Sequence, residues 1–497
     1  MLFESPLLLF TIVLKTFITL HNDLKKYLTK QMTKQEHILI VGAGLCGSLL
    51  TLRMAQRGYK VTLVEKRPDL RKTEQDAGRS INLALSNRGL QGLRLAGVEE
   101  EAKKLCIPMY GRMIHDKQGN TFLSKYSGRN NEYINSISRP GLNMLLLDAA
   151  EKMPNVTLVF NHGCKTVDLE NASATFKNYE TGAETSFSGD ILLGTDGAGS
   201  AVRKSMFNHR KFLFSFSQQW LTHGYKELEI PATKEGGYRT DKGALHIWPR
   251  GEDMLIALPN LDGSFTVTLF LPYSNSDYCF DNLTTPEMVL EYFTKEFPDA
   301  VALMPNLAEE FFQNPTGPLG TIKCSPWNCY GKTLLLGDAA HAIVPFYGQG
   351  MNASFEDVVV FDAILDKHEG DWTKVFHEYE KNRIADTNAI ADLAVDNFHE
   401  MKEHTASELF QQKRKLETAF EAEFPKEYYS KYSLVTFNEA ISYDEAMKKG
   451  RAQDKAILNL IDDGTLKDTM TLREKLELVK KETKEILHDD AVVRNLK

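Results

Sequence analysis

The sequence has no C-x-x-C pair. Its six cysteines stand singly, at positions 46, 106, 164, 279, 324 and 329. Zinc sites and disulfide frameworks are built from paired or regularly spaced cysteines, so neither is indicated and no metal site is predicted. Unpaired cysteines favour a reducing, cytoplasmic setting.

Long runs of one charge are also missing. The net charge is −8 and the isoelectric point is about 6.0, and the chain carries no basic run or basic-aromatic stripe. This balance argues against nucleic acid as the main partner.

Apolar runs are too short to predict a membrane span. Residues 6–20 are apolar but contain Lys15, and no small-x-small cleavage site follows them. Met32 begins a stretch that resembles a natural start. We therefore expect residues 1–31 to be an N-terminal extension: an over-extended reading frame, a disordered segment or a surface helix. A membrane anchor is the alternative.

The chain does have a strand–helix–strand pattern. The apolar run HILIV (37–41) precedes a glycine turn, a segment with helical spacing follows, and YKVTLVE (59–65) predicts a second strand. Three strand-like runs between 244 and 272 predict an antiparallel sheet, and residues from 351 onward have helical spacing. The expected fold class is α/β: a Rossmann-like domain interrupted by an antiparallel sheet, then a helical C-terminal part. With 497 residues, two or three domains are expected.

The glycine turn has the spacing of a dinucleotide-binding motif. Gly42 and Gly44 allow a tight turn and a close approach to a pyrophosphate, while Gly47 lets the helix pack on the strand. Glu65 ends the second strand, where a carboxylate can accept hydrogen bonds from a ribose diol. A turn of glycines without a ligand is the alternative.

Two later segments resemble motifs of the FAD-dependent aromatic hydroxylases. One is KTLLLGDAAHAIVPFYGQGMNASFED (332–357), which resembles their GD motif, and the other is GTDGAGSAVR (194–203), which resembles their DG motif. In that family the aspartate of the GD motif binds near the ribityl-phosphate region of the flavin. The helix that follows this motif points its N-terminus at the flavin ring. Each segment alone could be a plain glycine loop; three motifs in this order favour FAD over NAD.

Residues 36 to about 445 resemble more closely the kynurenine-hydroxylating branch of these enzymes. The segments that carry the resemblance are GRSINLALSNRG (78–89), GRMIH (111–115), LHIWPR (245–250), the 337–357 segment and SLVTF (433–437). The resemblance implies a flavoprotein monooxygenase that converts L-kynurenine to 3-hydroxy-L-kynurenine with NADPH and O₂, through a flavin hydroperoxide, in tryptophan degradation and NAD biosynthesis. A hydroxylase of another aromatic acid and a non-catalytic protein of the same fold are the alternatives.

The resemblance also implies site residues. Those expected at FAD are Gly42, Gly44, Cys46, Gly47, Glu65, Lys66, Arg67, Ala84, Arg139, Cys164, Ala201, Asp338, Met351 and Asn352. Those expected at the substrate are Arg112, which would pair with the amino acid carboxylate, Tyr126, Asn397 and Tyr432. No catalytic residue is assigned, because the chemistry is the flavin's. SKYSG around Tyr126 and Asp396 before Asn397 depart from the family pattern.

We expect the chain to divide into three parts after the extension. The FAD-binding domain is expected to comprise residues 32–105, 135–210 and 315–370. The substrate domain is expected to comprise 106–134 and 211–314, and the helical part 371–497. No second GxGxxG follows a strand, so NADPH is expected to bind transiently near the flavin.

Single polar residues permit two interpretations each. His341 could be a base, but a hydrogen-bonded loop residue is favoured. By default Asp76, Arg79 and Arg88 would form a solvated charge cluster, whereas the resemblance implies that the two arginines neutralise phosphate and substrate charge. Trp248 is expected in the core.

Overall fold

The structure is a computed structural model that describes residues 35–72, 82–400 and 408–488. The extension predicted for 1–31 lies outside the described residues. Asp76 and Arg79, in the segment 73–81, lie outside them as well. The described strands form four sheets, with six, seven, three and three strands.

The six-stranded sheet is the nucleotide-binding type that the first residues predict. Its order is β18-β19-β12-β1-β2-β8, with parallel pairing throughout except between β18 and β19. The strands are β1 (His37–Val41), β2 (Lys60–Val64), β8 (Val156–Val159), β12 (Ile191–Gly194), β18 (Asn328–Cys329) and β19 (Thr333–Leu335). Helices α2 (Leu45–Gln56) and α5 (Arg139–Glu151) pack on one another beside this sheet. The predicted strand–helix–strand unit is confirmed.

Two small sheets flank this core. One is a meander of β9 (His162–Asp168), β10 (Ser173–Asn178) and β11 (Glu184–Ser188), followed after β12 by α6 (Ala201–Asn208). The other joins β3 (Asn82–Leu85), β4 (Cys106–Met109) and β7 (Ile134–Ser138), with α3 (Asn87–Leu95) and α4 (Glu99–Lys103) between β3 and β4. Residues 82–85 of the segment GRSINLALSNRG form β3, which pairs with β7.

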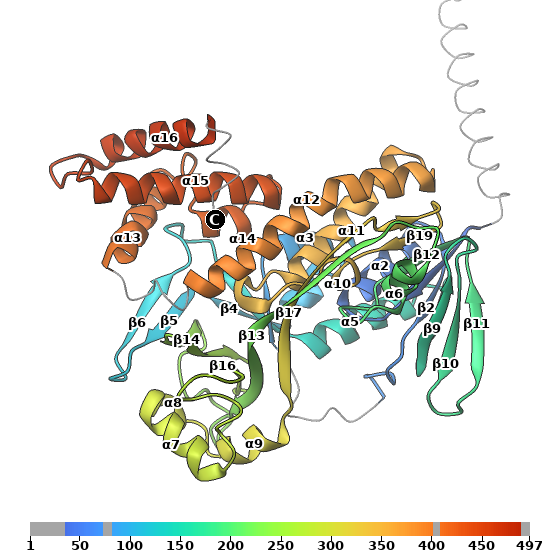
Figure 1. The fold of residues 1–497 in the computed structure, drawn as a ribbon, viewed down its shortest axis with the longest axis horizontal. Helices are drawn as coiled ribbons and strands as arrows, with labels where there is room; N and C mark the ends of the chain where they lie inside the picture. Colours follow the sequence, from blue (N-terminus) through green and yellow to red (C-terminus); the bar gives the residue numbers. More distant parts are fainter. Residues whose placement is uncertain (1–34, 73–81, 401–407, 489–497) are drawn as a thin grey trace, which may run out of the picture.

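The seven-stranded sheet contains the three strands predicted between 244 and 272. Its members are β5 (Gly111–His115), β6 (Thr121–Lys125), β13 (Ser215–Ile230), β14 (Leu245–Arg250), β15 (Asp253–Pro259), β16 (Phe265–Pro272) and β17 (Thr316–Ser325). Every residue of β16 is buried, because both faces are covered. Val267 and Leu269 face the core beneath α7 (Pro286–Glu296), α8 (Pro298–Val301) and α9 (Leu307–Gln313), whereas Phe270 faces the opposite core. Figure 1 shows these three short helices at the bottom of the molecule.

The C-terminal part is helical, as predicted. After α10 (Asp338–His341) and a 3-10 turn, η1 (Pro345–Tyr347), the helices are α11 (Gly350–Lys367), α12 (Trp372–His399), α13 (Glu408–Glu423), α14 (Lys431–Thr436), α15 (Tyr443–Asp462) and α16 (Leu472–His488). Figure 1 shows α13, α15 and α16 grouped above β5 and β6, with α15 packed against α12 and α14. Within the described ranges, no helix is both long and apolar enough to cross a bilayer.

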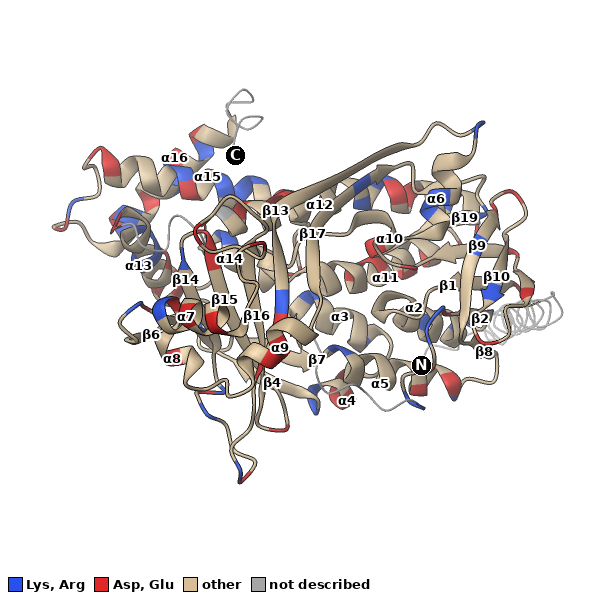
Figure 2. Ribbon diagram, turned by 60° about the horizontal axis from the view of Figure 1, so that its bottom comes forward, with Lys and Arg blue, Asp and Glu red and all other residues tan. Residues whose placement is uncertain are grey.

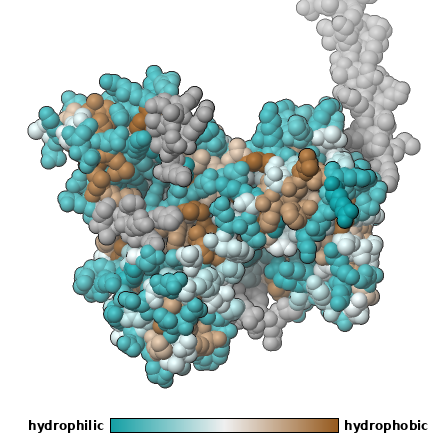
Figure 3. Space-filling view, viewed as in Figure 1, coloured by the Kyte–Doolittle hydropathy of each residue, from teal (hydrophilic) through white to brown (hydrophobic). Residues whose placement is uncertain are grey.

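The surface carries charges of both signs. Figure 2 shows basic and acidic residues interspersed along α13, α15 and α16, where pairs such as Arg473–Glu427 (2.8 Å) form. Figure 3 shows mostly hydrophilic atoms, with apolar atoms gathered over α6 and the start of β13. Large exposed apolar side chains in this region include Phe207, Leu213 and Phe216.

Candidate functional site

The glycine turn between β1 and α2 leaves room for a ligand on one side only. Gly42 has φ +98°, and a Cβ there would lie 2.6 Å from the Cα of Asp196. A Cβ at Gly47 would lie 2.0 Å from the Gly42 carbonyl oxygen, so this glycine is required for packing. A Cβ at Gly44 would meet nothing within 4 Å. The space beside Gly44, at the N-terminus of α2, fits a phosphate group.

Glu65 joins the end of β2 to this turn. Its Oε2 accepts a hydrogen bond from the Ala43 N–H at 2.7 Å, and its Oε1 accepts from the backbone N–H and Nε of Arg67, at 3.1 and 2.8 Å. Glu65 is buried, whereas Lys66 and Arg67 are exposed. The Glu65 carboxylate is therefore held beside the open space at Gly44. If a phosphate group lies in that space, the ribose attached to it would come next to Glu65.

The GD segment turns sharply after β19. Gly337 has φ +59°, and Asp338 begins α10. Burial raises the pKa of Asp338, although the nearby charges of Arg139 and His341 oppose the shift. His341 bonds through Nε2 to Asp357 Oδ2 at 2.6 Å and is buried, so the favoured interpretation of a hydrogen-bonded residue is confirmed, with the difference that it lies in a short helix.

Asn352 connects α11 to β3. Its Nδ2 donates to the carbonyl oxygens of Ala84 and Gly348, each at 2.8 Å, and its Oδ1 accepts from the Ser86 N–H at 3.0 Å. The side chain is fully buried, so it positions β3 against the start of α11. Met351, one residue before it, is partly exposed.

The remaining residues expected at FAD lie on four elements around this core. Cys46 is buried on α2, with its thiol 3.7 Å from the Ser354 carbonyl oxygen. Arg139 is the exposed first residue of α5, and Cys164 is partly buried on β9. Ala201 starts α6, where its N–H donates to Asp196 at 2.6 Å.

Three of the residues expected at the substrate meet in one cage. The guanidinium of Arg112, on β5, lies 4.8 Å from the ring centre of Tyr432 and 5.7 Å from that of Tyr126. The rings of Tyr126 and Tyr432 stack at 5.4 Å, and Tyr432 also stacks on Tyr347 at 5.6 Å. The sequence analysis missed Tyr347, although it lies inside the segment that was analysed for its glycines.

The cage has unused hydrogen-bonding capacity. Among the described residues, Arg112 Nε and the Tyr126 hydroxyl are buried without a hydrogen-bond partner. Burial alone would lower the pKa of Arg112, but Tyr432, Tyr126 and other neighbours raise it above its ordinary value, so the group stays cationic. Burial raises the pKa of Tyr126 well above its ordinary value, which keeps the phenol protonated. A buried cation and a neutral hydroxyl, both with free donors, fit a carboxylate ligand.

Asn397 lies behind the cage. Its Nδ2 donates to the Phe346 carbonyl oxygen at 2.7 Å and so holds the turn that carries Tyr347. Asp396, which departs from the family pattern, bonds to Arg451 Nε at 3.1 Å. Asp396 therefore forms an ion pair that joins α12 to α15.

The expectation that Arg88 belongs to a solvated charge cluster is wrong. Arg88 is 0% exposed and forms an ion pair with Glu356. Three backbone carbonyl groups of the C-terminal part occupy its other donors. Charged side chains were expected in solvent by default, but the contacts of Arg88 turn it toward α11 and the C-terminal part.

Known proteins share this arrangement. A family model described as an FAD binding domain matches residues 35–216 and 309–393. A kynurenine 3-monooxygenase of Myxococcus xanthus is 44% identical over 447 residues, covering 90% of this chain and 95% of the relative. Another, of Dictyostelium discoideum, is 42% identical over 436 residues, covering 85% and 93%. The chain belongs to the kynurenine 3-monooxygenase family.

Solved structures show the same fold outside the kynurenine 3-monooxygenases. A 2-methyl-3-hydroxypyridine-5-carboxylic acid oxygenase has 19% identity and a TM-score of 0.61, covering 80% of this chain and 99% of that chain. PqsL of Pseudomonas aeruginosa, in complex with 2-aminobenzoylacetate, has 16% identity and a TM-score of 0.60, covering 77% and 99%. At these identities the likeness concerns the fold alone, and it confirms the predicted aromatic-hydroxylase architecture.

Proposed function

We propose that the chain hydroxylates L-kynurenine at ring position 3, with FAD as cofactor and NADPH and O₂ as co-substrates. The observation that carries the proposal is the cationic Arg112 with a free Nε among tyrosine rings. An amino acid with an aromatic ring needs a partner for its carboxylate and apolar walls for its ring, and this cage offers both. The relatives named above add the choice of kynurenine.

FAD would occupy the residues around the glycine turn. Gly42, Gly44 and Gly47 would let the pyrophosphate approach α2, and Glu65, with Lys66 and Arg67 beside it, would hold the adenosine ribose. Ala84, Asp338, Met351 and the backbone of Asn352 would contact the ribityl chain and ring, with Cys46, Arg139, Cys164 and Ala201 at the remaining contacts. When bound, FAD supplies the redox chemistry between NADPH, O₂ and the substrate.

The substrate residues would bind, orient and exclude water. Arg112 would pair with the kynurenine carboxylate, and the Tyr126 hydroxyl would donate a further hydrogen bond to it. Tyr432 and Tyr347 would cover the carboxylate end, while Asn397 would keep Tyr347 in place through the Phe346 carbonyl. A dry, rigid site matters here because water admitted to it would divert the oxidising equivalents to H₂O₂.

The domain division predicted from the sequence is part of the same proposal. The strand that carries Arg112, β5, pairs in parallel with β14 of the seven-stranded sheet, which supports assigning the β5–β6 part (111–125) of residues 106–134 to the substrate domain. The first strand of that range, β4, pairs instead with β7 in the small sheet that contains β3. NADPH would bind transiently near the flavin, and the protein would act in the cytoplasm.

Product analysis tests the proposal. The purified protein, reconstituted with FAD, is supplied with NADPH and air and with either L-kynurenine or another aromatic acid, such as 4-hydroxybenzoate. We expect a yellow protein that oxidises NADPH faster with kynurenine and releases 3-hydroxykynurenine. Acceleration by the other acid alone would replace the substrate assignment, and a colourless protein that cannot be loaded with FAD would refute the cofactor assignment.

A further inference from the structure

Arg88 is a fully buried arginine that is assigned neither to the cofactor site nor to the substrate site. Its Nε donates to the Val435 carbonyl oxygen at 2.8 Å, and its Nη2 donates to those of Asn438 and Ile441 at 3.0 and 2.8 Å. Its Nη1 forms an ion pair with Glu356. Burying a guanidinium is costly unless its donors are satisfied, so this many partners mark a fixed structural position.

The carbonyl groups that Arg88 binds belong to the end of α14 and to the segment after it. The last carbonyl groups of a helix have no partner within the helix, and a cation at this end is favourable. Helix α14 spans only Lys431–Thr436, too short to be stable alone. Its other end is held by Ser430, which caps it, and by Lys431, which pairs with Asp454 at 2.7 Å. Tyr432 of the cage lies between these two points of attachment.

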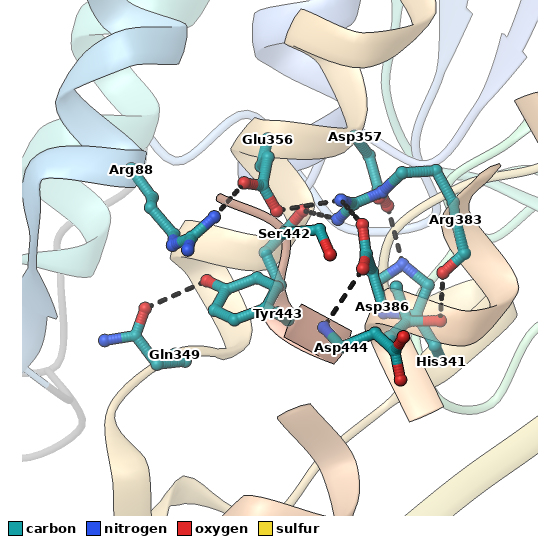
Figure 4. A network of polar contacts seen from close by, with 12 residues as sticks. Arg88, His341, Gln349, Glu356, Asp357, Arg383, Asp386, Ser442, Tyr443 and Asp444 are labelled. Carbon is teal, nitrogen blue, oxygen red and sulfur yellow. Dashed lines mark hydrogen bonds and ion pairs between the residues drawn. The ribbon is translucent and has the colours of Figure 1, made fainter. Parts of the chain in front are cut away.

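Arg88 also lies at the start of the helix that follows the cofactor strand. Ser86, two residues earlier, donates its N–H to Asn352, which in turn binds the Ala84 carbonyl. On the far side, the ring of Tyr443 lies 4.1 Å from the Arg88 guanidinium, and its hydroxyl donates to Gln349 at 3.0 Å. Figure 4 shows Arg88, Glu356, Tyr443 and Gln349 close together.

The ion pair continues to the GD turn. Glu356 accepts from Arg383 at 2.8 Å, and Arg383 donates to Asp357 at 2.8 Å. Asp357 accepts from the Gly337 N–H at 2.9 Å and bonds to His341. A continuous chain of buried polar contacts therefore joins α14 to the turn before Asp338, as Figure 4 shows for its central part.

We propose that Arg88 is a positioning residue that fixes the C-terminal end of α14, and with it Tyr432, relative to the cofactor strand. Arg88 thereby sets the shape of the substrate cage without touching substrate or FAD. This inference rests on the proposed function, since it assumes that the cage binds kynurenine.

Arg88→Lys tests the proposal on the full chain loaded with FAD. Lysine keeps a charge near Glu356 but cannot reach all the carbonyl groups that the planar fork reaches. Arg250→Lys is the matched control, because Arg250 also donates to backbone carbonyl groups, among them that of His115 at 3.0 Å, but its partners, at positions 115, 116, 249 and 296, lie outside α14 and the segment after it. Kynurenine affinity by calorimetry, FAD content, melting temperature, kcat, KM and H₂O₂ yield are measured for both.

We expect both variants to retain FAD and to lose stability to a similar degree. Arg88→Lys should bind kynurenine about tenfold more weakly, with a raised KM and a larger share of NADPH ending as H₂O₂, whereas Arg250→Lys should keep the wild-type affinity. Equal kynurenine affinity in Arg88→Lys and the wild type would overturn the proposal. A wild-type protein that binds no kynurenine would refute the proposed function instead.

A double-mutant cycle with Tyr432→Ala tests whether Arg88 acts through Tyr432. If it does, Arg88→Lys weakens kynurenine binding much less in the Tyr432→Ala background, and fully additive effects would overturn the proposal. If Arg88→Lys does not fold, hydrogen exchange of the wild type decides. Kynurenine must then protect the amides of 431–441 and 84–90 together, and protection of only one segment or of neither would overturn the proposal.

Discussion

The imidazole rings of His115 and His246 share a hydrogen bond, with 2.8 Å between Nε2 of the first and Nδ1 of the second. At the outer ends, His246 Nε2 faces the Asp241 carbonyl oxygen at 2.7 Å, and His115 Nδ1 faces Asp299 Oδ2 at 2.6 Å. Trp248 Nε1 donates to the same carboxylate oxygen at 2.8 Å.

The outer partner of His246 is a carbonyl oxygen, which only accepts hydrogen bonds, so His246 Nε2 must carry a proton. Burial alone would raise the pKa of Asp299, but the hydrogen bonds from His115 and Trp248 outweigh it and lower the pKa, so the carboxyl is ionised. Burial lowers the pKa of His246 to about 4, which keeps that ring neutral. The neutral His246 ring therefore carries its proton at Nε2, which donates to the Asp241 carbonyl oxygen, and its Nδ1 is left as an acceptor that faces His115.

Acid should destabilise the protein through His246. The pKa of His246 is about 4 in the folded state against 6.5 ordinarily, so the unfolded chain binds more protons between these values and stability falls as pH falls. From pH 7 to pH 5 this loss should be about 2 kcal/mol. His246→Gln offers the same acceptor and donor without titrating, so its unfolding free energy, measured by denaturant titration, should depend less on pH. An unchanged pH dependence would contradict the assignment.

Local features of the fold followed from the sequence, whereas contacts between distant segments did not. The apolar pattern of residues 37–65 predicted β1, α2 and β2, and the glycine spacing predicted the β1–α2 turn, because these signals act within a few residues. The parallel pairing of Arg112 with Leu245 joins strands more than 100 residues apart in sequence, and no local pattern encodes it.

The site shows the same division. Arg112, Tyr126 and Tyr432 were expected together only from a family resemblance, and the roles given to them remain predictions. Tyr347 was missed because the segment that contains it was interpreted through its resemblance to the cofactor-binding GD motif, not as part of the substrate site. Arg88 was misjudged because the acid and the carbonyl groups that compensate its burial come from α11 and the C-terminal part, which the sequence does not place.

The glycine turn predicts opposite outcomes for two similar substitutions. Gly44→Ala adds a methyl group that meets no protein atom within 4 Å, so folding should be unaffected, whereas the same methyl group would occupy the space expected for the pyrophosphate. Its melting temperature without FAD should match the wild type, and its FAD affinity should fall at least tenfold. Gly47→Ala should instead lower the melting temperature of the FAD-free protein, because its Cβ would lie 2.0 Å from a backbone oxygen. Normal FAD affinity in Gly44→Ala would argue against a phosphate at this turn.

Asp338→Ala should weaken FAD retention. The carboxyl stands at the start of α10, directly after the turn at Gly337, where the family resemblance places the ribityl chain. We expect a lower flavin-to-protein ratio after gel filtration, with little change in the melting temperature of the FAD-free protein. Asp148→Ala, at an exposed position on α5, is the control. Full flavin occupancy in Asp338→Ala would remove this residue from the cofactor site.

Arg112→Met should strongly weaken kynurenine binding while sparing FAD. Methionine keeps part of the apolar stem but has no donors, so the carboxylate would be buried beside Tyr126 and Tyr432 without its cationic partner. Truncating one member of a buried charge pair costs about 2–5 kcal/mol, equivalent to a roughly 30- to 5000-fold loss of affinity.

Tyr126→Phe is the graded companion, because it removes only the hydroxyl that is buried without a partner and keeps the stacked ring. Losing one hydrogen bond to a charged group should cost about 1.5–3 kcal/mol, less than the loss of Arg112. Calorimetry with kynurenine, flavin absorbance and peroxide yield on the same samples separate these effects. If both variants bind kynurenine like the wild type with flavin in place, the carboxylate lies elsewhere, and the cage of Arg112 and the tyrosines has another ligand.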